Sequence, residues 1–177
     1  QTTDPYLFSS IYPIVNDIPD ESSVNIPGFD LEPVTNNFTF NDFSESVFSA
    51  GSLSLTIVND LVIPLGDVDV KLKSSDGIEI SGASTTIAGP INSGTQASGM
   101  LDLAGVTLPG SVIVEVTGSS PGQDNVLINE DAKNSSFSVQ ISGSDLEVIS
   151  ATAKIPAQTI SESGSIDLAA DSNKVVL

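Results

Sequence analysis

Residues 51–77 read GSLSLTIVNDLVIPLGDVDVKLKSSDG and carry the plainest structural signal in the chain. Apolar and polar residues alternate on both sides of an interruption at 59–64, so successive side chains point to opposite faces of an extended strand. The pattern predicts one buried face and one solvated face. The segment from Asn59 to Pro64 is expected to be a bend between two strands, and the predicted core residues are Leu53, Leu55, Ile57, Val68, Val70 and Leu72.

The same two-residue period recurs along the rest of the chain, and helical periodicity is weak. The segment SSDG at 74–77 has the residues of a turn, and later apolar runs are separated by Gly-, Pro- and Ser-rich breaks. Residues 41–49 fit either a short helix or a strand. We therefore predict an all-β antiparallel β-sandwich of about eight strands, with later strands at 84–88, 97–103, 111–117, 136–141, 145–154 and 164–168.

Composition excludes several classes of chemistry. The 177 residues include no Cys, no His and no Trp. Thiolate nucleophiles, Cys-based metal sites, and Ser-His-Asp or Cys-His catalysis are therefore excluded. No spacing of carboxylates singles out a glycosidase pair, so we expect a protein that is not an enzyme.

The charge balance narrows the partners and the location. The chain has 23 acidic residues against 5 basic ones, a net charge of −18, so a cationic surface for nucleic acid is excluded. No run approaches the roughly 20 apolar residues that span a bilayer, and we expect no membrane insertion by this segment. Such acidity suits a secreted, cell-surface or cell-envelope protein.

The first 48 residues differ in composition from the rest. They hold eight of the nine aromatic residues and five of the ten prolines. We expect 1–48 to be an extended arm, or the end of a preceding module, and 49–177 to be a sandwich domain that continues past Leu177. The arm either folds back to complete its own core, which we favour, or docks on a neighbouring subunit by strand addition, through Tyr6, Phe8, Tyr12, Phe38, Phe40, Phe43 and Phe48.

Two groups of carboxylates are candidates for Ca²⁺ binding, because Ca²⁺ takes oxygen ligands. One lies on a predicted strand and the turn after it, where Lys71 and Lys73 follow directly. We favour a solvated strand face there, with cross-strand charge pairs. The other lies in a predicted loop, where ligands converge more easily, although an exposed acidic loop is favoured there too. The two groups are Asp67, Asp69 and Asp76, and Asp124, Glu130 and Asp131.

Residues 51–117 resemble the late-embryogenesis-abundant (LEA14-type) and immunoglobulin-like sandwiches. The resemblance rests on LSLTIVND, the bend LVIPL, the strands VDVKLKSSDGIEI, the loop PINSGTQASG and the run LDLAGVTLPGSVIVEV. It implies a non-enzymatic sandwich module and carries over no ligand or catalytic residue. A further echo of residues 51–64 in residues 143–156, GSDLEVISATAKIP, is suggestive of tandem β modules, although the alternating face shifts by one residue.

Together these features predict a structural or assembly module of an acidic extracellular or envelope protein, such as a spacer, a filament subunit or a subunit of a surface complex. Its expected partners are other subunits or tandem domains, and no cofactor is expected. The alternative is a Ca²⁺-dependent adhesion or ligand-binding domain. A hydrolase, or an accessory domain of one, is the least favoured interpretation.

Overall fold

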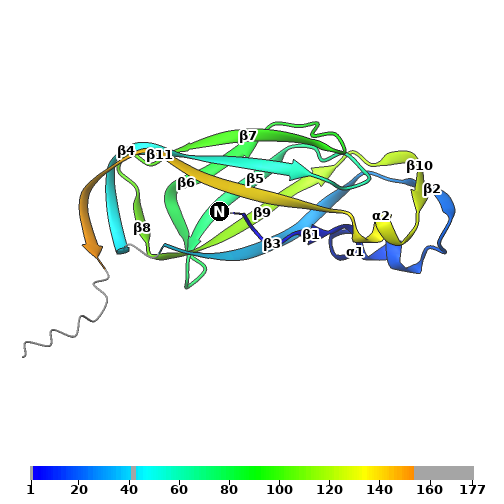
Figure 1. Cartoon of the computed structure of the whole chain (residues 1–177), viewed down its shortest axis with the longest axis horizontal. Coiled ribbons are helices and arrows are strands. Elements are labelled where there is room, and N and C mark those ends of the chain that lie inside the picture. Colours follow the sequence, from blue (N-terminus) through cyan, green and yellow to red (C-terminus); the bar gives the residue numbers. More distant parts are fainter. Residues whose placement is uncertain (1, 41–42, 154–177) are drawn as a thin grey trace, which may run out of the picture.

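A computed structural model describes residues 2–40 and 43–153, which form two antiparallel sheets packed face to face (Figure 1). The prediction of an all-β antiparallel sandwich is confirmed. A two-stranded ribbon and three short helical segments cover one end of the sandwich. Within the described ranges, no helix has the length and apolar character needed to cross a bilayer.

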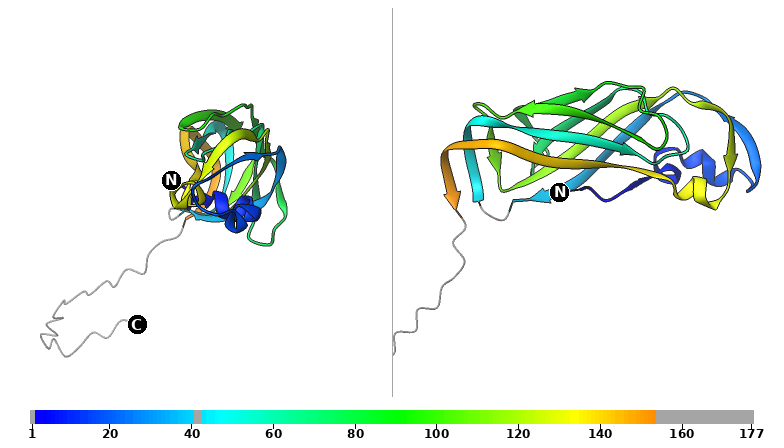
Figure 2. Two further views of the ribbon diagram at one scale, coloured as in Figure 1. Left: turned by 90° about the vertical axis from the view of Figure 1, so that its right-hand side faces the viewer. Right: turned by 45° about the horizontal axis from the view of Figure 1, so that its top comes forward.

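The first sheet has the order β1–β11–β4–β7, with β8 added beside β4. Its longest strands are β4 and β11, which run side by side along the molecule and turn together at one end (Figure 2). Its strands are β1 (Tyr6–Leu7), β4 (Phe43–Asn59), β7 (Thr95–Asp102), β8 (Thr107–Pro109) and β11 (Ser136–Ala153).

The second sheet has the order β3–β9–β5–β6. Because β6 lies beside β7, one side of the sandwich is closed, whereas the opposite side has β3 facing β11 and β1. The strands are β3 (Phe29–Thr39), β5 (Val68–Ser74), β6 (Glu79–Ile87) and β9 (Ser111–Ser120). The remaining elements are α1 (Phe8–Ile11), η1 (Pro13–Asp17), α2 (Glu130–Asn134) and the ribbon of β2 (Ser22–Ile26) with β10 (Gln123–Ile128).

The core is mainly aliphatic, as the alternating strands predict, and it also holds Phe8, Phe38, Phe48 and Phe137. Alternate residues are buried between the sheets over most of β5 and β9, namely Val68, Val70, Leu72, Val112, Val114 and Val116. The predicted core residues are at most 4% exposed, namely Leu53, Leu55, Ile57, Val68, Val70 and Leu72. Burial of such side chains is the main favourable term for a fold of this kind.

The predicted bend at 59–64 is built around one buried polar side chain. Asn59 is fully buried and donates from Nδ2 to the carbonyl oxygens of Ile63, at 3.1 Å, and Ile91, at 2.8 Å. Its Oδ1 accepts from the Leu61 amide at 3.1 Å. The side chain thus supplies a partner to the Leu61 amide and the Ile63 carbonyl, which no strand ladder reaches, and it adds a second hydrogen bond to the Ile91 carbonyl, which also accepts from the Leu65 amide.

The expected division at residue 48 is not a structural boundary. Strand β4 crosses it without interruption, and β3 is hydrogen-bonded to β9 from Phe29 to Thr39. Residues 8–17 form two short helical segments, so the first 35 residues do not follow a continuously extended path. The prolines of this segment do not mark an extended arm. Pro33 lies at a bulge of an edge strand and Pro13 begins a helical turn, and both positions tolerate proline.

Strand boundaries differ from the expectation in two further places. Residues 136–153 form one strand, β11, where two were predicted, with bulges between Ser144 and Ser150 at the apparent break. Residues 43–49 belong to β4, so the strand alternative is correct there. The predicted strand at 164–168 lies outside the described residues.

Candidate functional site

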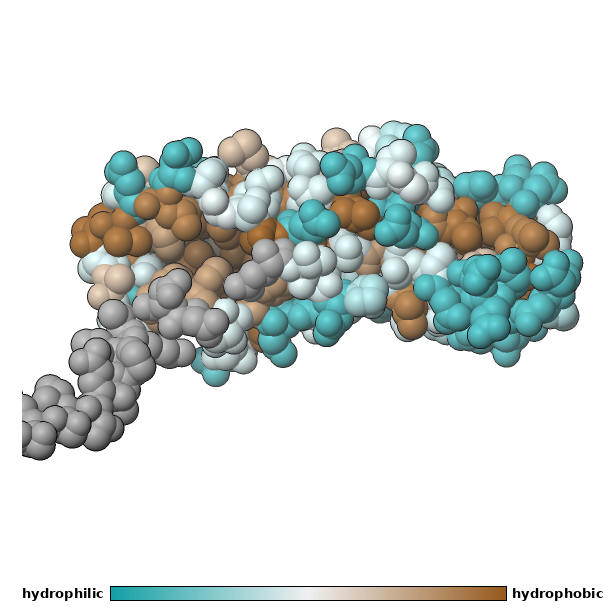
Figure 3. Space-filling view, viewed as in Figure 1, coloured by the Kyte–Doolittle hydropathy of each residue, from teal (hydrophilic) through white to brown (hydrophobic). Residues whose placement is uncertain are grey.

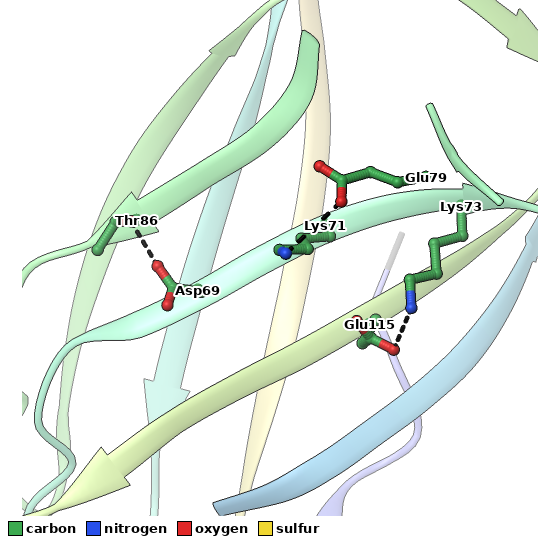
Figure 4. Close-up of polar contacts among 6 residues, drawn as sticks. All are labelled: Asp69, Lys71, Lys73, Glu79, Thr86 and Glu115. Atoms are coloured by element: carbon green, nitrogen blue, oxygen red, sulfur yellow. Dashed lines mark hydrogen bonds and ion pairs between the residues drawn. The ribbon is translucent and has the colours of Figure 1, made fainter. Parts of the chain in front are cut away.

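Of the carboxylates of the opening stretch, Asp69 lies on β5, on the solvated face of the second sheet (Figure 4). Asp69 accepts a hydrogen bond from the Thr86 hydroxyl on β6, and Asp67 accepts one from the Gly89 amide at 2.8 Å. Asp76 lies in the exposed turn between β5 and β6. Asp67 and Asp69 therefore hold neighbouring segments together, and the three carboxylates do not gather into one metal-binding group.

The two lysines of β5 form ion pairs across the strands on either side. Lys73 Nζ lies 2.5 Å from Glu115 Oε2 on β9, and both side chains are largely buried, at 24% and 17% exposure. Lys71 Nζ lies 3.5 Å from Glu79 Oε2 on β6, and this pair is more exposed, at 40% and 47%. The arrangement is the cross-strand pairing expected of a solvated face.

The second group of carboxylates is divided between two elements. Asp124 lies on β10, whereas Glu130 and Asp131 form the first turn of α2, which Asn129 caps by accepting from the Ala132 amide. The helix is held by Lys133, which pairs with Asp20 at 2.8 Å. Among residues 2–40 and 43–153, no three His, Cys, Asp or Glu residues gather into a group that could hold a metal ion.

The aromatic residues proposed for docking divide between the two ends of the sandwich, and three of them are core residues. Phe8, Phe38 and Phe48 are at most 7% exposed. The other four are partly buried and pack against the same core, namely Tyr6, Tyr12, Phe40 and Phe43. The structure therefore matches the favoured interpretation, in which this segment completes its own core.

The aromatic contacts show how each end is filled. At the end that carries α1, Tyr12 stacks on Phe8 with ring centroids 5.8 Å apart and contacts Phe29 at 4.7 Å. At the other end, Phe40 stacks on Phe43 at 5.1 Å. Offset and tilted rings of this kind add to the free energy of burial.

Tyr6 is the one described side chain with a buried polar atom that lacks a hydrogen bond of standard geometry. Its ring packs on Phe137 at a centroid distance of 4.9 Å. Burial raises the pKa of the Tyr6 hydroxyl above its usual value; the nearby Thr3 side chain lowers it in part, and the negative charge of Asp4 raises it further.

An apolar groove of about 290 Å³ lies on the open side of the sandwich. It lies between Phe38 and Phe40 on one sheet and the middle of β11 on the other. None of its side chains is titratable, so it suits an apolar side chain rather than a reaction. Its lining residues are Phe38, Phe40, Leu53, Leu72, Val112, Ile141, Ser142, Gly143 and Leu146.

The outer edge of β11 is covered only in part. The chain from Thr2 to Leu7 runs antiparallel along residues 136–140, with Tyr6 opposite Phe137 and Thr2 opposite Gln140. Beyond Ile141, no strand among the described residues pairs with this outer edge. The groove lies next along β11, at Ile141, Ser142 and Gly143, on the same side of the sandwich.

Next to the groove, β4 and β11 turn over the end of the sandwich, and apolar side chains gather there (left in Figure 3). Leu146, Val148 and Ile149 are 48%, 51% and 70% exposed. The bulges that surround them disrupt the alternation of β11, so these side chains leave the core. We name Leu146, Val148 and Ile149 the apolar end. The consecutive Val-Ile pair was the available sequence signal, because it breaks the two-residue period.

Comparisons with known proteins assign no family. No protein-family profile matches the chain, and no curated protein matches it. Among solved structures, the chain is similar to SACOL2612, a CocE/NonD family hydrolase from Staphylococcus aureus, at 14% identity and a TM-score of 0.21. That similarity covers 73% of this chain and 32% of the hydrolase, and it is too weak to carry an argument about fold or activity.

Proposed function

We propose that the protein is a non-catalytic structural module of an acidic extracellular or cell-envelope assembly, acting as a spacer, a filament subunit or a subunit of a surface complex. The observation that supports this most directly is the length of the paired strands β4 and β11. They contain 17 and 18 residues, and their ladder runs through the whole sandwich. Strands of globular proteins usually have 3–10 residues, so both strands are unusually long, and they bend only where they turn over the end of the sandwich.

The regular part of this ladder, from the Asn59–Phe137 pair to the Ser52–Ser144 pair, stiffens the sandwich along its length, because bending it would disrupt many cross-strand hydrogen bonds and the core beneath them. The sandwich ends in an exposed apolar surface formed by Leu146, Val148 and Ile149. Exposed apolar patches on soluble domains commonly mark contacts with other proteins. Stiffness along the molecule and an apolar end together suit a building block that joins further domains or subunits.

Fractionation of the source cells, with an antibody raised against the sandwich, tests the proposal. The protein is expected in the extracellular or envelope fraction, in a complex several times its own mass after mild extraction. A monomer recovered from the cell interior would contradict the proposal. So would turnover of ester, peptide or glycoside substrates by the purified chain above the rate in buffer.

A further inference from the structure

The inward face of β11 lacks a side chain at Gly143. Alternate residues of a strand share a face, so Phe137, Val139, Ile141 and Gly143 lie on the face that meets the core. Phe137 and Val139 are at most 1% exposed, and Ile141 is partly buried against the same core. Gly143 is opposite Leu53, which is itself 4% exposed. The groove therefore lies where the inward series of β11 ends in a residue without a side chain.

The backbone of Gly143 faces away from β4. Val139 shows this direction, because its carbonyl accepts from the Thr3 amide at 2.9 Å and its amide donates to Thr3 Oγ1 at 3.0 Å. The ladder with β4 is regular as far as Ser144, so Gly143 directs its amide and carbonyl to the same outer edge. No described residue is hydrogen-bonded to either group. An open strand edge of this kind is a template for a further strand.

The N-terminal segment shows how a strand is received at this edge. Thr3, which is bonded to Val139, is 6% exposed, so a residue held at the outer edge places its side chain against the core. A strand that continued this line along β11 would place one side chain over the groove, opposite Gly143. The groove volume of about 290 Å³ is at the lower limit of ligand pockets, roughly 300 Å³, and suits one large apolar side chain.

The charges beside the groove favour a basic occupant. Asp145 and Glu147 follow Gly143 on β11; both are exposed, and neither forms an ion pair with any described residue. The three lysines within residues 2–40 and 43–153 already have carboxylate partners. Two copies of a chain with a net charge of −18 repel each other. A different, basic polypeptide therefore fits this edge better than a second copy does.

We propose that β11 receives, at residues 142–144, an extended segment of another subunit that runs antiparallel to it. The segment inserts one large apolar side chain into the groove and carries Lys or Arg on either side. The proposal rests on the proposed assembly role and names the kind of partner. Because the bulges after Ser144 end the regular edge, the paired stretch is short, and burial of the apolar side chain carries much of the affinity.

The first experiment titrates the isotope-labelled 177-residue chain with the peptide KTTTFTTTK and follows amide chemical shifts by NMR. The peptide has one Phe, a Lys at each end, and Thr residues that favour an extended backbone. Saturable binding is expected with a Kd of about 100 µM, with the Gly143 amide among the largest shifts. The peptides KTTTSTTTK and ETTTFTTTE are expected to bind at least about 10-fold more weakly, because the first leaves the groove empty and the second is repelled by Asp145 and Glu147.

Each peptide tests a different part of the proposal. The absence of a saturable shift at Gly143 with KTTTFTTTK up to about 1 mM would overturn the site. Equal affinity for KTTTSTTTK would show that the groove takes no side chain, and equal affinity for ETTTFTTTE would show that the partner need not be basic. Either result overturns the proposal as stated.

The second experiment compares Gly143→Pro with Gly143→Ala. Both substitutions add a Cβ, which must displace Leu146 Cδ1 from a distance of 2.9 Å. Only proline also removes the amide donor, and proline is tolerated where that donor faces outward from an edge strand. The Pro variant is expected to bind KTTTFTTTK at least about 10-fold more weakly than the Ala variant does. Equal affinity would overturn strand addition, and the peptide comparisons on the parent chain stand even if the Pro variant fails to fold.

Sedimentation velocity of the 177-residue chain, at the concentrations of the titration, tests the other occupant. A monomer is expected. A dimer that Gly143→Pro abolishes and Gly143→Ala preserves would show that a second copy covers this edge, which would overturn the proposal. None of these measurements depends on where the protein is located in the cell, so the proposed assembly role and this site can fail separately.

Discussion

Asn59 Nδ2 donates a hydrogen bond to the Ile91 carbonyl oxygen at 2.8 Å, and this contact ties the end of β4 to the loop before β7. The same side chain also binds the Ile63 carbonyl and the Leu61 amide. A single residue therefore fixes the bend through which the chain passes from one sheet to the other. Its position at the end of an alternating strand is visible in the sequence, but its burial is not.

Replacing Asn59 by Ala is expected to lower the free energy of unfolding by about 3 kcal/mol, because the Leu61 amide and the Ile63 carbonyl lose the partner that Asn59 supplies in a buried site. Urea unfolding measures the loss. Asn37→Ala is the control, since Asn37 is an exposed strand residue, and it is expected to change stability by less than about 0.5 kcal/mol. Equal effects of the two substitutions would contradict the role of Asn59.

The two ion pairs of β5 are expected to differ in strength. Glu115→Gln should cost about 1 kcal/mol, because Lys73 and Glu115 are largely buried and water screens their attraction only in part. Glu79→Gln should cost less than about 0.5 kcal/mol, because the pair with Lys71 is exposed. Double-mutant cycles with each lysine give the two coupling energies. A coupling energy for Lys71 and Glu79 as large as that for Lys73 and Glu115 would refute this ranking.

Tyr6→Phe is expected to leave stability unchanged or to raise it by up to about 1 kcal/mol at pH 7, since the buried hydroxyl has no hydrogen bond of standard geometry to lose. Burial raises the pKa of the hydroxyl in the folded state. The raised pKa therefore contributes fully to the free energy of unfolding at pH values below the unfolded pKa of about 10. This contribution is lost as the pH rises through the pKa of the folded state. When the free energy of unfolding is measured from pH 7 to 11, it should fall less for Tyr6→Phe than for the parent protein above pH 10. An equal fall in the two proteins would disprove this.

Calcium is expected to leave the protein's thermal stability unchanged. The candidate carboxylates lie on separate elements, and Asp67 and Asp69 already accept hydrogen bonds from Gly89 and Thr86. A ligand that binds only the folded state must raise the Tm. Calorimetry in 5 mM EDTA and in millimolar Ca²⁺ distinguishes the two functional interpretations. A rise in Tm with Ca²⁺ that EDTA reverses would revive the adhesion interpretation.

The sequence allowed the sheet architecture to be predicted wherever the two-residue period was clean. Val68, Val70 and Leu72 alternate with polar residues, and the structure buries all three. Strand β3 was missed because its alternation is interrupted at Pro33, where a bulge shifts the register. Local pattern cannot show that an edge strand continues past a bulge, since the pairing that stabilises it comes from β9, about 80 residues later.

The candidate surface was harder to predict than the core. The aromatic residues of the first segment attracted attention, but whether they face a partner or a core depends on tertiary packing that composition does not report. Val148 and Ile149 lie in a segment predicted as an ordinary strand, and their exposure follows from the bulges of β11. The ion pairs of Lys71 and Lys73 were expected as cross-strand contacts, but their particular partners depend on the register of three strands.

The aromatic-rich beginning of the chain forms part of the same sandwich as the strands that follow it. Amide hydrogen exchange of the 177-residue chain tests this most directly, by comparing peptides from β3 (29–39) with peptides from its partner β9 (111–120). Because these strands share a ladder and a core, we predict that their protected amides exchange at rates within about tenfold of each other. Exchange of 29–39 at the rate of an unfolded peptide, while 111–120 stays protected, would contradict the account.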